Sequence, residues 1–420
     1  MIKTFELQPG VILRCCQDSR FKMNCLSVQL VRPACRQEAA ANALMPAVLL
    51  RGTQSCPDLR DITLRLDDLY GASVGALVRR VGDYQTTGLA CGFTEDRFAL
   101  NGDAILEPMA DFLQELLLKP RLEQGIFCKE FVESEKRNLL AAIEARKNDK
   151  RLYAAGQLTK FMCAADPVGI PRLGEPEDVA ALEPEGLYRH YAKILRESTV
   201  ELFYVGAQAP ERICGLLSRL FENTPRQHCP LPPQTPFRDG GKTRNEEFLD
   251  VTQAKLQMGF LSPATIKTTD FAVMQVLCSV FGSSSISKLF MNVREKMSLC
   301  YDIGSSYQGT KGILTVGAGM DQDQVETVEQ EVMNQLEQCR RGNISALELE
   351  AARQSLLSSL RSVHDSPGAI ENYYATAALS GLGMSIQEYM DQVSQVDVSQ
   401  LAQAAQSLQL HSVYTLKGVQ

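Results

Sequence analysis

Histidine is the first residue type to consider, because imidazole both binds metals and transfers protons near neutral pH. A helical metal site needs two histidines, or a histidine and a glutamate, three or four residues apart on one face. No histidine in this chain has such a neighbour. The four histidines are His190, His228, His364 and His411.

Two of these histidines have reactive neighbours of other kinds. His228 precedes Cys229 in a proline-rich stretch, where the two side chains could ligate a metal or lie solvated in a loop. His364 precedes Asp365 near Ser358 and Ser366, an arrangement that suggests a hydrolytic dyad. A chain with many serines produces such neighbours by chance, so the sequence favours ordinary surface positions for both histidines.

Cysteine is common, but its spacing indicates no framework. The thirteen cysteines are scattered and odd in number, so at least one stays unpaired in any oxidised form. We interpret them as reduced thiols, mostly small core residues. Cys15 and Cys16 are adjacent and could form a redox pair, yet they lack the Cys-x-x-Cys spacing, and ordinary packing is the simpler interpretation.

Composition excludes several function classes. The chain has 420 residues, 45% hydrophobic and 22% charged, which is typical of a soluble protein with more than one domain. The net charge of -7 is dispersed, and no basic run is present to meet nucleic acid or an anionic membrane. The N-terminus lacks the apolar core of a secretory signal, and no segment is long enough to span a bilayer. We therefore expect a cytoplasmic protein.

Segment 224–242, TPRQHCPLPPQTPFRDGGK, holds five prolines and a Gly-Gly pair, so it can form neither a helix nor a central strand. We predict a linker here, with a first lobe over 1–223 and a second over 243–420. Both lobes show the same order of elements, which indicates an internal duplication.

The elements themselves follow hydrophobic periodicity. In the first half, 25–31 and 86–96 are predicted strands around an apolar helix over 38–50. In the second half, a strand over 255–261, helices over 271–281 and 287–296, and a strand pair over 304–321 repeat this order. Ser345 with Glu348 forms a capping-box pattern. The similar segments 200–207 and 411–418 close the two halves, so we predict an α+β fold.

One long motif in the second half carries a family resemblance. Residues 282–301 read GSSSISKLFMNVREKMSLCY, and the first half adds LLRGT (49–53), FVESEKRNLLAAIEA (131–145) and LYRHYAKILRESTVELFYVG (187–206). Over the whole chain these segments resemble the M16 zinc peptidases, the insulinase and mitochondrial processing peptidase group. The resemblance implies two homologous M16-type lobes, each an antiparallel-rich sheet faced by helices.

The resemblance at this motif implies that two residues, Arg294 and Tyr301, bind substrate. In the family this pair holds a backbone carbonyl of the substrate beside the scissile bond, a role suited to a guanidinium and a phenol. An arginine at a helix end is also often only ion-paired, and a tyrosine before a strand is often a core-edge residue. Both interpretations stay open at this point.

The resemblance also indicates that the metal site is lost. Active members carry His-x-x-Glu-His just before the segment that matches Arg51-Gly52-Thr53, with two zinc ligands and a general base. This chain has Ala43, Pro46 and Ala47 there. The more distant ligand position falls on Ala142, close to Glu144, which could not hold zinc alone. We expect no metal, no cofactor and no catalytic residue of the usual kind, and Pro46 in the first turn of its helix or at a kink.

These features suggest a non-catalytic, substrate-binding or regulatory subunit of a two-chain M16 zinc peptidase. Its partner would be a zinc-bearing homologue in a heterodimer, or the chain would form a homodimer, and its ligand would be a peptide. Two alternatives remain: a structural or peptide-binding protein without peptidase activity, and a hydrolase with an atypical site. The NDKRLYA segment (148–154) further resembles M16-like proteins associated with modification of elongation factor P.

Overall fold

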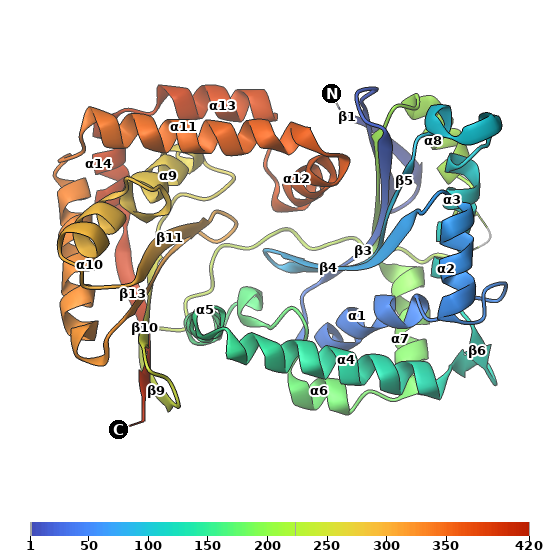
Figure 1. Cartoon of the computed structure of the whole chain (residues 1–420), viewed down its shortest axis with the longest axis horizontal. Helices are drawn as coiled ribbons and strands as arrows, with labels where there is room; N and C mark the ends of the chain where they lie inside the picture. The colour runs from blue at the N-terminus through green and yellow to red at the C-terminus, as the bar shows by residue number, and fades with distance from the viewer. Residues whose placement is uncertain (1, 223, 420) are drawn as a thin grey trace. The chain divides into compact units, whose positions relative to one another are not determined.

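A computed structural model describes residues 2–222 and 224–419. Two compact units are present, and each contains parts of both halves of the chain (Figure 1). Unit 1 comprises Met1–Glu144, Ile170–Gln234 and Val363–Leu379. Unit 2 comprises Ala145–Gly169, Thr235–Ser362 and Ser380–Gln420.

The chain passes between the units inside the proline-rich segment, at residues 234 and 235, and at four further places. Segment 145–169 of the first half therefore belongs to unit 2, and segment 363–379 of the second half belongs to unit 1. Sequence periodicity does not predict this exchange. It indicates which face of a helix or strand is buried, but it does not identify the sheet against which that face packs. The boundaries predicted at 223 and 243 concern the two duplicated halves of the sequence and not the two compact units, and they stay a prediction.

Sheet 1 lies in unit 1 and has the strand order β1-β2-β8-β3-β5-β4. Only β2 and β8 are parallel, and all other neighbours are antiparallel. The strands are β1 (Ile2–Gln8), β2 (Val11–Gln17), β3 (Met23–Pro33), β4 (Ser73–Val81), β5 (Tyr84–Thr94) and β8 (Thr199–Gly206). The predicted strands over 25–31, 86–96 and 200–207 lie within or close to β3, β5 and β8.

Alternation along β3 separates the two faces of sheet 1. Leu26, Val28 and Leu30 point into the apolar core, whereas Ser27 and Gln29 contact Glu371 on the opposite face. The core face carries most helices of the unit, and the polar face carries α12. The helices are α1 (Arg36–Leu49), α2 (Leu59–Asp68), α3 (Leu106–Leu118), α4 (Lys129–Asn148), α6 (Pro176–Ala180), α7 (Pro184–Glu197), α8 (Pro210–Leu217) and α12 (Pro367–Ser380). A short hairpin joins β6 (Leu122–Glu123) to β7 (Ile126–Phe127).

Sheet 2 repeats the pairing pattern of sheet 1. Its order is β11-β12-β10-β13-β9, again with one parallel pair, β13 and β9, and antiparallel pairs elsewhere. The strands are β9 (Thr243–Leu249), β10 (Ala254–Leu261), β11 (Asp302–Gln308), β12 (Ile313–Met320) and β13 (Gln409–Gly418). By position, β9 corresponds to β2, β13 to β8, β10 to β3, β12 to β5 and β11 to β4. This match confirms the predicted duplication and the α+β fold.

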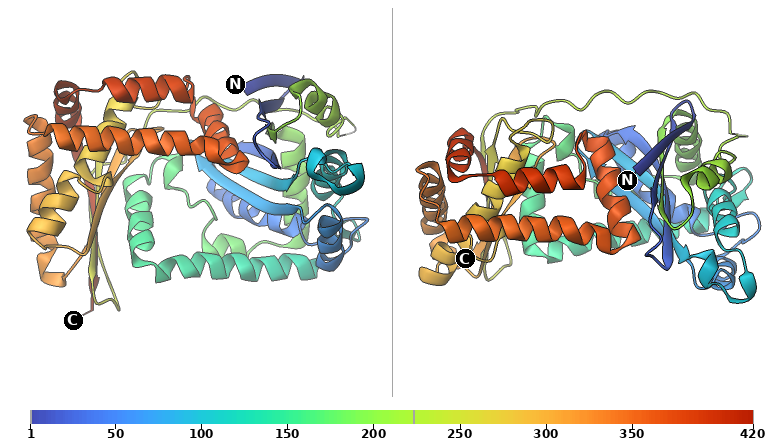
Figure 2. Two further views of the ribbon diagram at one scale, coloured as in Figure 1. Left: turned by 45° about the horizontal axis from the view of Figure 1, so that its top comes forward. Right: turned by 90° about the horizontal axis from the view of Figure 1, so that it is seen from above.

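Helices cover both faces of sheet 2. α5 packs on β10 and β13 from one side, and α10 and α14 lie on the other side (Figure 1). Figure 2 shows α10, in orange, and α14, in dark red, on the side of sheet 2 away from α5, in green. The helices are α5 (Lys150–Met162), α9 (Phe271–Cys278), α10 (Val325–Arg340), α11 (Ala346–Ser362), α13 (Ile386–Gln395) and α14 (Val398–Ser407). The predicted capping box before α11 is confirmed, since Ser345 and Glu348 bond each other's backbone N–H groups.

Two stretches of unit 2 wind as π-helices, η4 (Ser279–Ser283) and η5 (Leu289–Lys296). The sequence predicted ordinary helices over 271–281 and 287–296, and the hydrophobic pattern cannot tell a wider winding from an α-helix. π-helical segments are rare and are often found at functional sites. Across 2–222 and 224–419, every helix is too short or too polar to cross a membrane.

Candidate functional site

The helix α1 carries the positions that match the metal-binding segment. Ala43 and Pro46 are buried and Ala47 is partly buried, and none of the three side chains has an atom that can coordinate a metal. Within the described ranges, no cluster of three His, Cys, Asp or Glu side chains is arranged to hold an ion. The residues present therefore do not fit the zinc ion of active relatives.

Pro46 lies in the last turn of α1 and not in the first turn, which was one of the two positions expected for it. A proline there lacks the N–H that would bond the carbonyl of Asn42, four residues earlier. Thr87 of β5 replaces this donor, because its Oγ1 donates to the Asn42 oxygen over 2.6 Å. The helix keeps its proline because a side chain from the sheet satisfies the buried carbonyl.

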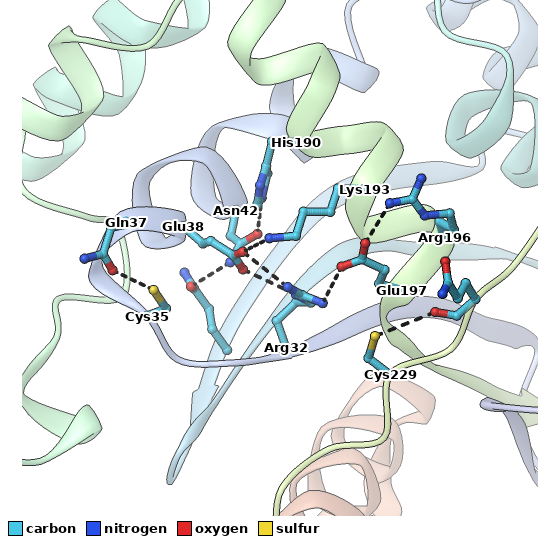
Figure 3. Close-up of polar contacts among 12 residues, drawn as sticks. Arg32, Cys35, Gln37, Glu38, Asn42, His190, Lys193, Arg196, Glu197 and Cys229 are labelled. Atoms are coloured by element: carbon cyan, nitrogen blue, oxygen red, sulfur yellow. Dashed lines mark hydrogen bonds and ion pairs between the residues drawn. The ribbon is translucent and has the colours of Figure 1, made fainter.

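A chain of buried amides joins α1 to α7 and β5 (Figure 3). His190 Nε2 lies 2.7 Å from Asn42 Oδ1, and Asn42 Nδ2 donates to Gln85 Oε1 over 3.0 Å. Gln85 Nε2 in turn donates to the carbonyls of Ala39 and Arg172. An amide oxygen can only accept, so His190 carries its proton on Nε2. Burial lowers the pKa of His190 to about 4, which keeps the imidazole neutral at physiological pH.

Ion pairs surround this chain on the solvent side (Figure 3). Glu38 accepts from Lys193 over 2.7 Å and from Arg32 over 3.2 Å, and Arg32 also pairs with Glu197 at 3.6 Å. Arg196 completes the network by donating to Glu197 over 2.8 Å. Burial raises the pKa of Glu38, but the bonds from Lys193 and Arg32 outweigh it and hold the pKa below its usual range. The network fastens α1 to α7 and β3.

Sequence patterns do not predict this arrangement. His190 stands alone among the histidines, and Asn42 lies in an apolar run. The available signal was Asn42 itself, since a polar residue inside an apolar helix segment needs a buried hydrogen-bond partner.

The distant ligand position lies on α4. Ala142 and Glu144 are both exposed there. About two turns before Ala142 on the same helix, Glu135 pairs with Arg51 at 3.3 Å, and the Arg51 guanidinium lies 5.5 Å from the Phe131 ring centre. The motif Arg-Gly-Thr after α1 thus serves to hold α4 in place rather than to support a metal.

Arg294 lies in unit 2, on the π-helix η5. Its side chain is 40% exposed, and its guanidinium carbon lies 4.7 Å from the centre of the Phe290 ring. The nearest carboxylate is Glu295, with an N···O distance of 3.8 Å. An arginine that stacks on an aromatic ring and has only a long ion pair keeps most of its N–H donors available to a ligand.

Tyr301 follows η5 after a tight turn at Ser298, which has a φ of 53°. The tyrosine is 52% exposed, and its hydroxyl donates to Asp321 Oδ1 over 2.9 Å. That hydrogen bond raises the pKa of Tyr301. Met297 is 50% exposed beside it, whereas the intervening Cys300 is buried. Tyr301 therefore has a core neighbour but is not itself a core residue.

Among the described residues, hydrogen bonds connect one Ser-His-Asp arrangement, and its histidine is His411. Its Nδ1 lies 2.7 Å from Ser412 Oγ and its Nε2 lies 2.8 Å from Asp239 Oδ1. Ser412 is fully buried, and its hydroxyl accepts from Thr243 over 2.9 Å. A nucleophile needs access to a substrate carbonyl. This constellation therefore ties the proline-rich segment to β13 and does not act as a hydrolytic triad.

The remaining candidates are structural. His228 bonds Thr199 through its Nε2 at 2.9 Å, and the Cys229 N–H donates to the Glu197 carbonyl, so both residues fasten the proline-rich segment to unit 1. Burial raises the pKa of Cys15 to about 12 and also raises that of Cys16, which keeps both thiols protonated and unreactive. All thirteen cysteines are free thiols.

Comparisons with known proteins agree with this geometry. A family model described as "Peptidase M16 inactive domain" matches residues 181–356. The chain is 27% identical over 414 residues to the "Probable inactive metalloprotease YmfF" of Bacillus subtilis (strain 168), covering 98% of this chain and 96% of that protein.

Solved structures extend the match to the whole fold. A conserved protein from Enterococcus faecalis V583 superposes with a TM-score of 0.92 at 26% identity, covering 100% of this chain and 99% of that chain. A peptidase M16 inactive domain from Pseudomonas fluorescens gives a TM-score of 0.82 at 16% identity, with 100% and 98% covered. The duplicated sheets, the full-length relatives and the family model over 181–356 together show that this chain is similar to inactive members of the peptidase M16 family.

Proposed function

We propose that the chain is the non-catalytic subunit of a two-chain M16 zinc peptidase, in which it contributes Arg294 and Tyr301 to the binding of a peptide substrate. The observation that carries the proposal is a contrast within one chain. The metal helix has been converted into a packed structural element, whereas Arg294 and Tyr301 stay exposed on an unusual backbone. The partner in this proposal is a cytoplasmic, zinc-bearing M16 homologue.

The two side chains offer different contacts to a peptide carbonyl. Arg294 can donate at once, since its guanidinium is held in place by Phe290 rather than by a close carboxylate. Tyr301 has one hydroxyl proton, which it gives to Asp321 in this structure. Tyr301 must exchange that acceptor for the substrate carbonyl, and a hydrogen bond to a charged group contributes about 1.5–3 kcal/mol. Arg294 is therefore expected to provide the larger share of binding.

Reconstitution tests the proposal directly. The chain is mixed with the zinc-bearing homologue from its own genome, and cleavage of a fluorogenic peptide mixture is measured. Arg294→Ala should lower turnover by about 10- to 1000-fold, because a charge-assisted contact to developing negative charge is lost. Tyr301→Phe should cost less. Arg341→Ala is the matched control, since Arg341 is also exposed and ion-paired but lies directly after the end of α10.

Assembly must be measured on the same samples by size-exclusion chromatography. Normal assembly with reduced turnover in Arg294→Ala supports a role at the substrate. Equal turnover of wild type, both site variants and the control would show that the motif reports ancestry alone. Full activity of the chain without a partner would instead favour an atypical hydrolase.

A second candidate, peptide binding without hydrolysis, rests on strand β4. Among the residues that the structure describes, this strand is the last in sheet 1 and pairs with β5 alone. Ser73, Gly75 and Ala76 are exposed, and an open strand edge can take up an extended peptide through main-chain hydrogen bonds. Binding of an uncleaved peptide by the isolated chain, measured by fluorescence anisotropy, would favour this candidate.

A further inference from the structure

Unit 2 contains a small cavity where the start of α9 packs against α14 (Figure 1). Its volume is about 290 Å³, at the lower end of the range for ligand sites, so it has room for one small molecule or one side chain. It shares no lining residue with η5 or with Tyr301. The lining residues are Pro263, Ala264, Asp270, Val273, Met274, Gln400, Gln403, Ala404 and Ser407.

The buried part of the lining, which we call the floor, is apolar and held in place. It consists of Ala264, Val273 and Met274. The loop before α9 is fixed by two hydrogen bonds at Ala264, whose carbonyl accepts from the Tyr307 hydroxyl and whose N–H donates to Ser262 Oγ over 3.1 Å. The cavity is therefore formed before any ligand arrives, which lowers the ordering cost of binding.

The polar part of the lining carries one charge. Of the described residues that line the cavity, Asp270 alone is ionisable, and its side chain is exposed. Asp270 is the N-cap residue of α9, yet its carboxylate caps no backbone N–H, and within 2–222 and 224–419 it forms no ion pair. Lys267, three residues earlier, has its side chain against Gly381 instead. The carboxylate is therefore available to a positively charged ligand.

From this lining we infer that the cavity binds an aliphatic ammonium ion, with its methylene stem on the apolar floor and its charged end at Asp270. Methylene groups gain free energy by leaving water, and an ammonium group forms strong hydrogen bonds with a carboxylate. Its remaining N–H donors can use the amide oxygen of Gln403 or the hydroxyl of Ser407. The inference is independent of the proposed peptidase function.

An anion is the competing ligand, because the start of a helix carries a partial positive charge of about half a unit. Asp270 lies at this end of α9 and carries a full negative charge, which exceeds that partial charge. The local field therefore favours a cation. The same ligand chemistry has two sources, a free alkylamine and the lysine side chain of another protein, and the probes below distinguish them.

Titration of the full chain with n-pentylammonium chloride tests the inference, followed by NMR of methyl-labelled methionines. Met274 lines the cavity, so its methyl signal should shift saturably, with a dissociation constant on the order of 1 mM for so small a ligand. Met274→Leu assigns that signal. The signal of Met297, which is exposed near Arg294, should stay in place. No saturable shift of Met274 up to roughly 20 mM would overturn the inference.

Two changes remove the charge from one side of the contact at a time. Asp270→Asn keeps the shape of the side chain and should weaken binding about ten-fold, and neutral 1-pentanol should bind the wild type about ten-fold more weakly than pentylammonium. Asp391→Asn is the matched control, because Asp391 is an exposed carboxylate on α13 that accepts only from Gln387 among the described residues. Equal binding by Asp270→Asn, or equal binding of 1-pentanol, would overturn the inference.

A peptide identifies the source of the cation. The probe is acetyl-Gly-Lys-Gly-amide, which carries the same kind of stem and charge on a backbone. A peptide that shifts the Met274 signal as tightly as pentylammonium assigns the ligand to a lysine of a partner protein. A peptide that binds more than about ten-fold more weakly assigns it to a free amine, because the backbone does not fit the cavity mouth. Both results require pentylammonium to bind at the cavity and so uphold the inference.

Discussion

The clearest test of the α1 site is the pH dependence that His190 should impose on unit 1. The imidazole is neutral and partly buried in the native state, with its pKa lowered from 6.5 to about 4 by desolvation. In the unfolded chain the same group is protonated below pH 6.5. Folding must then release that proton, so native stability decreases as the pH falls from 6.5 to 4 and is unaffected by this group above that window.

The size of the effect follows from the two pKa values. One pKa unit corresponds to about 1.36 kcal/mol, so a fall from 6.5 to about 4 corresponds to about 3 kcal/mol of lost stability at pH 4. This is a large part of the stability of a typical domain, about 5–15 kcal/mol. Carboxylates with lowered pKa, such as Glu38, also lose stability in acid, so the wild-type curve alone cannot isolate His190.

The variant His190→Gln isolates it. A glutamine amide can still donate to Asn42 but does not titrate, and the carboxylate contribution is common to both proteins. The free energy of unfolding is measured in urea at pH 7, 6, 5 and 4 by circular dichroism, since the chain has no tryptophan for fluorescence. We expect the difference between wild type and variant to change by about 3 kcal/mol in favour of the variant between pH 7 and 4. A difference that stays constant with pH would refute the conclusion that His190 is neutral in the folded chain.

Two further predictions concern buried groups. Lys311 and Asp166 form an ion pair 3.1 Å apart, and both side chains are 0% exposed. Lys311→Met leaves a buried carboxylate unpaired and should destabilise unit 2 by about 3–5 kcal/mol. The double variant Lys311→Met/Asp166→Asn should recover part of that stability, as measured by urea unfolding. Thr87→Val should cost about 1–3 kcal/mol, because the Asn42 carbonyl loses the donor that stands in for the missing N–H of Pro46. Slow hydrogen exchange in α1 should be lost in that variant, and an unchanged melting temperature would contradict the assignment.

Local patterns predicted the elements of this fold well. The alternation at 25–31 and the apolar runs at 38–50 and 255–261 became β3, α1 and β10, because each pattern depends only on which face of an element is buried. The capping box at Ser345 also formed, since its two hydrogen bonds are made within one turn.

Features that depend on distant partners were not predictable in the same way. The donor for the Asn42 carbonyl comes from residue 87, and the imidazole that bonds the Asn42 side chain comes from residue 190. Nothing in the sequence around residue 42 specifies either partner. The π-helical winding around Arg294 was missed because its hydrophobic spacing fits an α-helix over so short a segment.

The packing around α1 leads to a last prediction, that returning the lost residues does not return the metal site. Ala43 is 6% exposed and Pro46 is buried, so Ala43→His/Pro46→Glu/Ala47→His inserts larger side chains into a packed region. Overpacking costs about 1–3 kcal/mol per site. The distant ligand position, Ala142, would still lack a carboxylate. We expect no stoichiometric zinc by mass spectrometry of the metal content, and a lowered melting temperature. Pro46→Ala is the control, since it restores the helix N–H without adding bulk and should keep or raise the melting temperature. One tightly bound zinc per chain in the triple variant would show that the ancestral pocket persists and that only its ligands were lost.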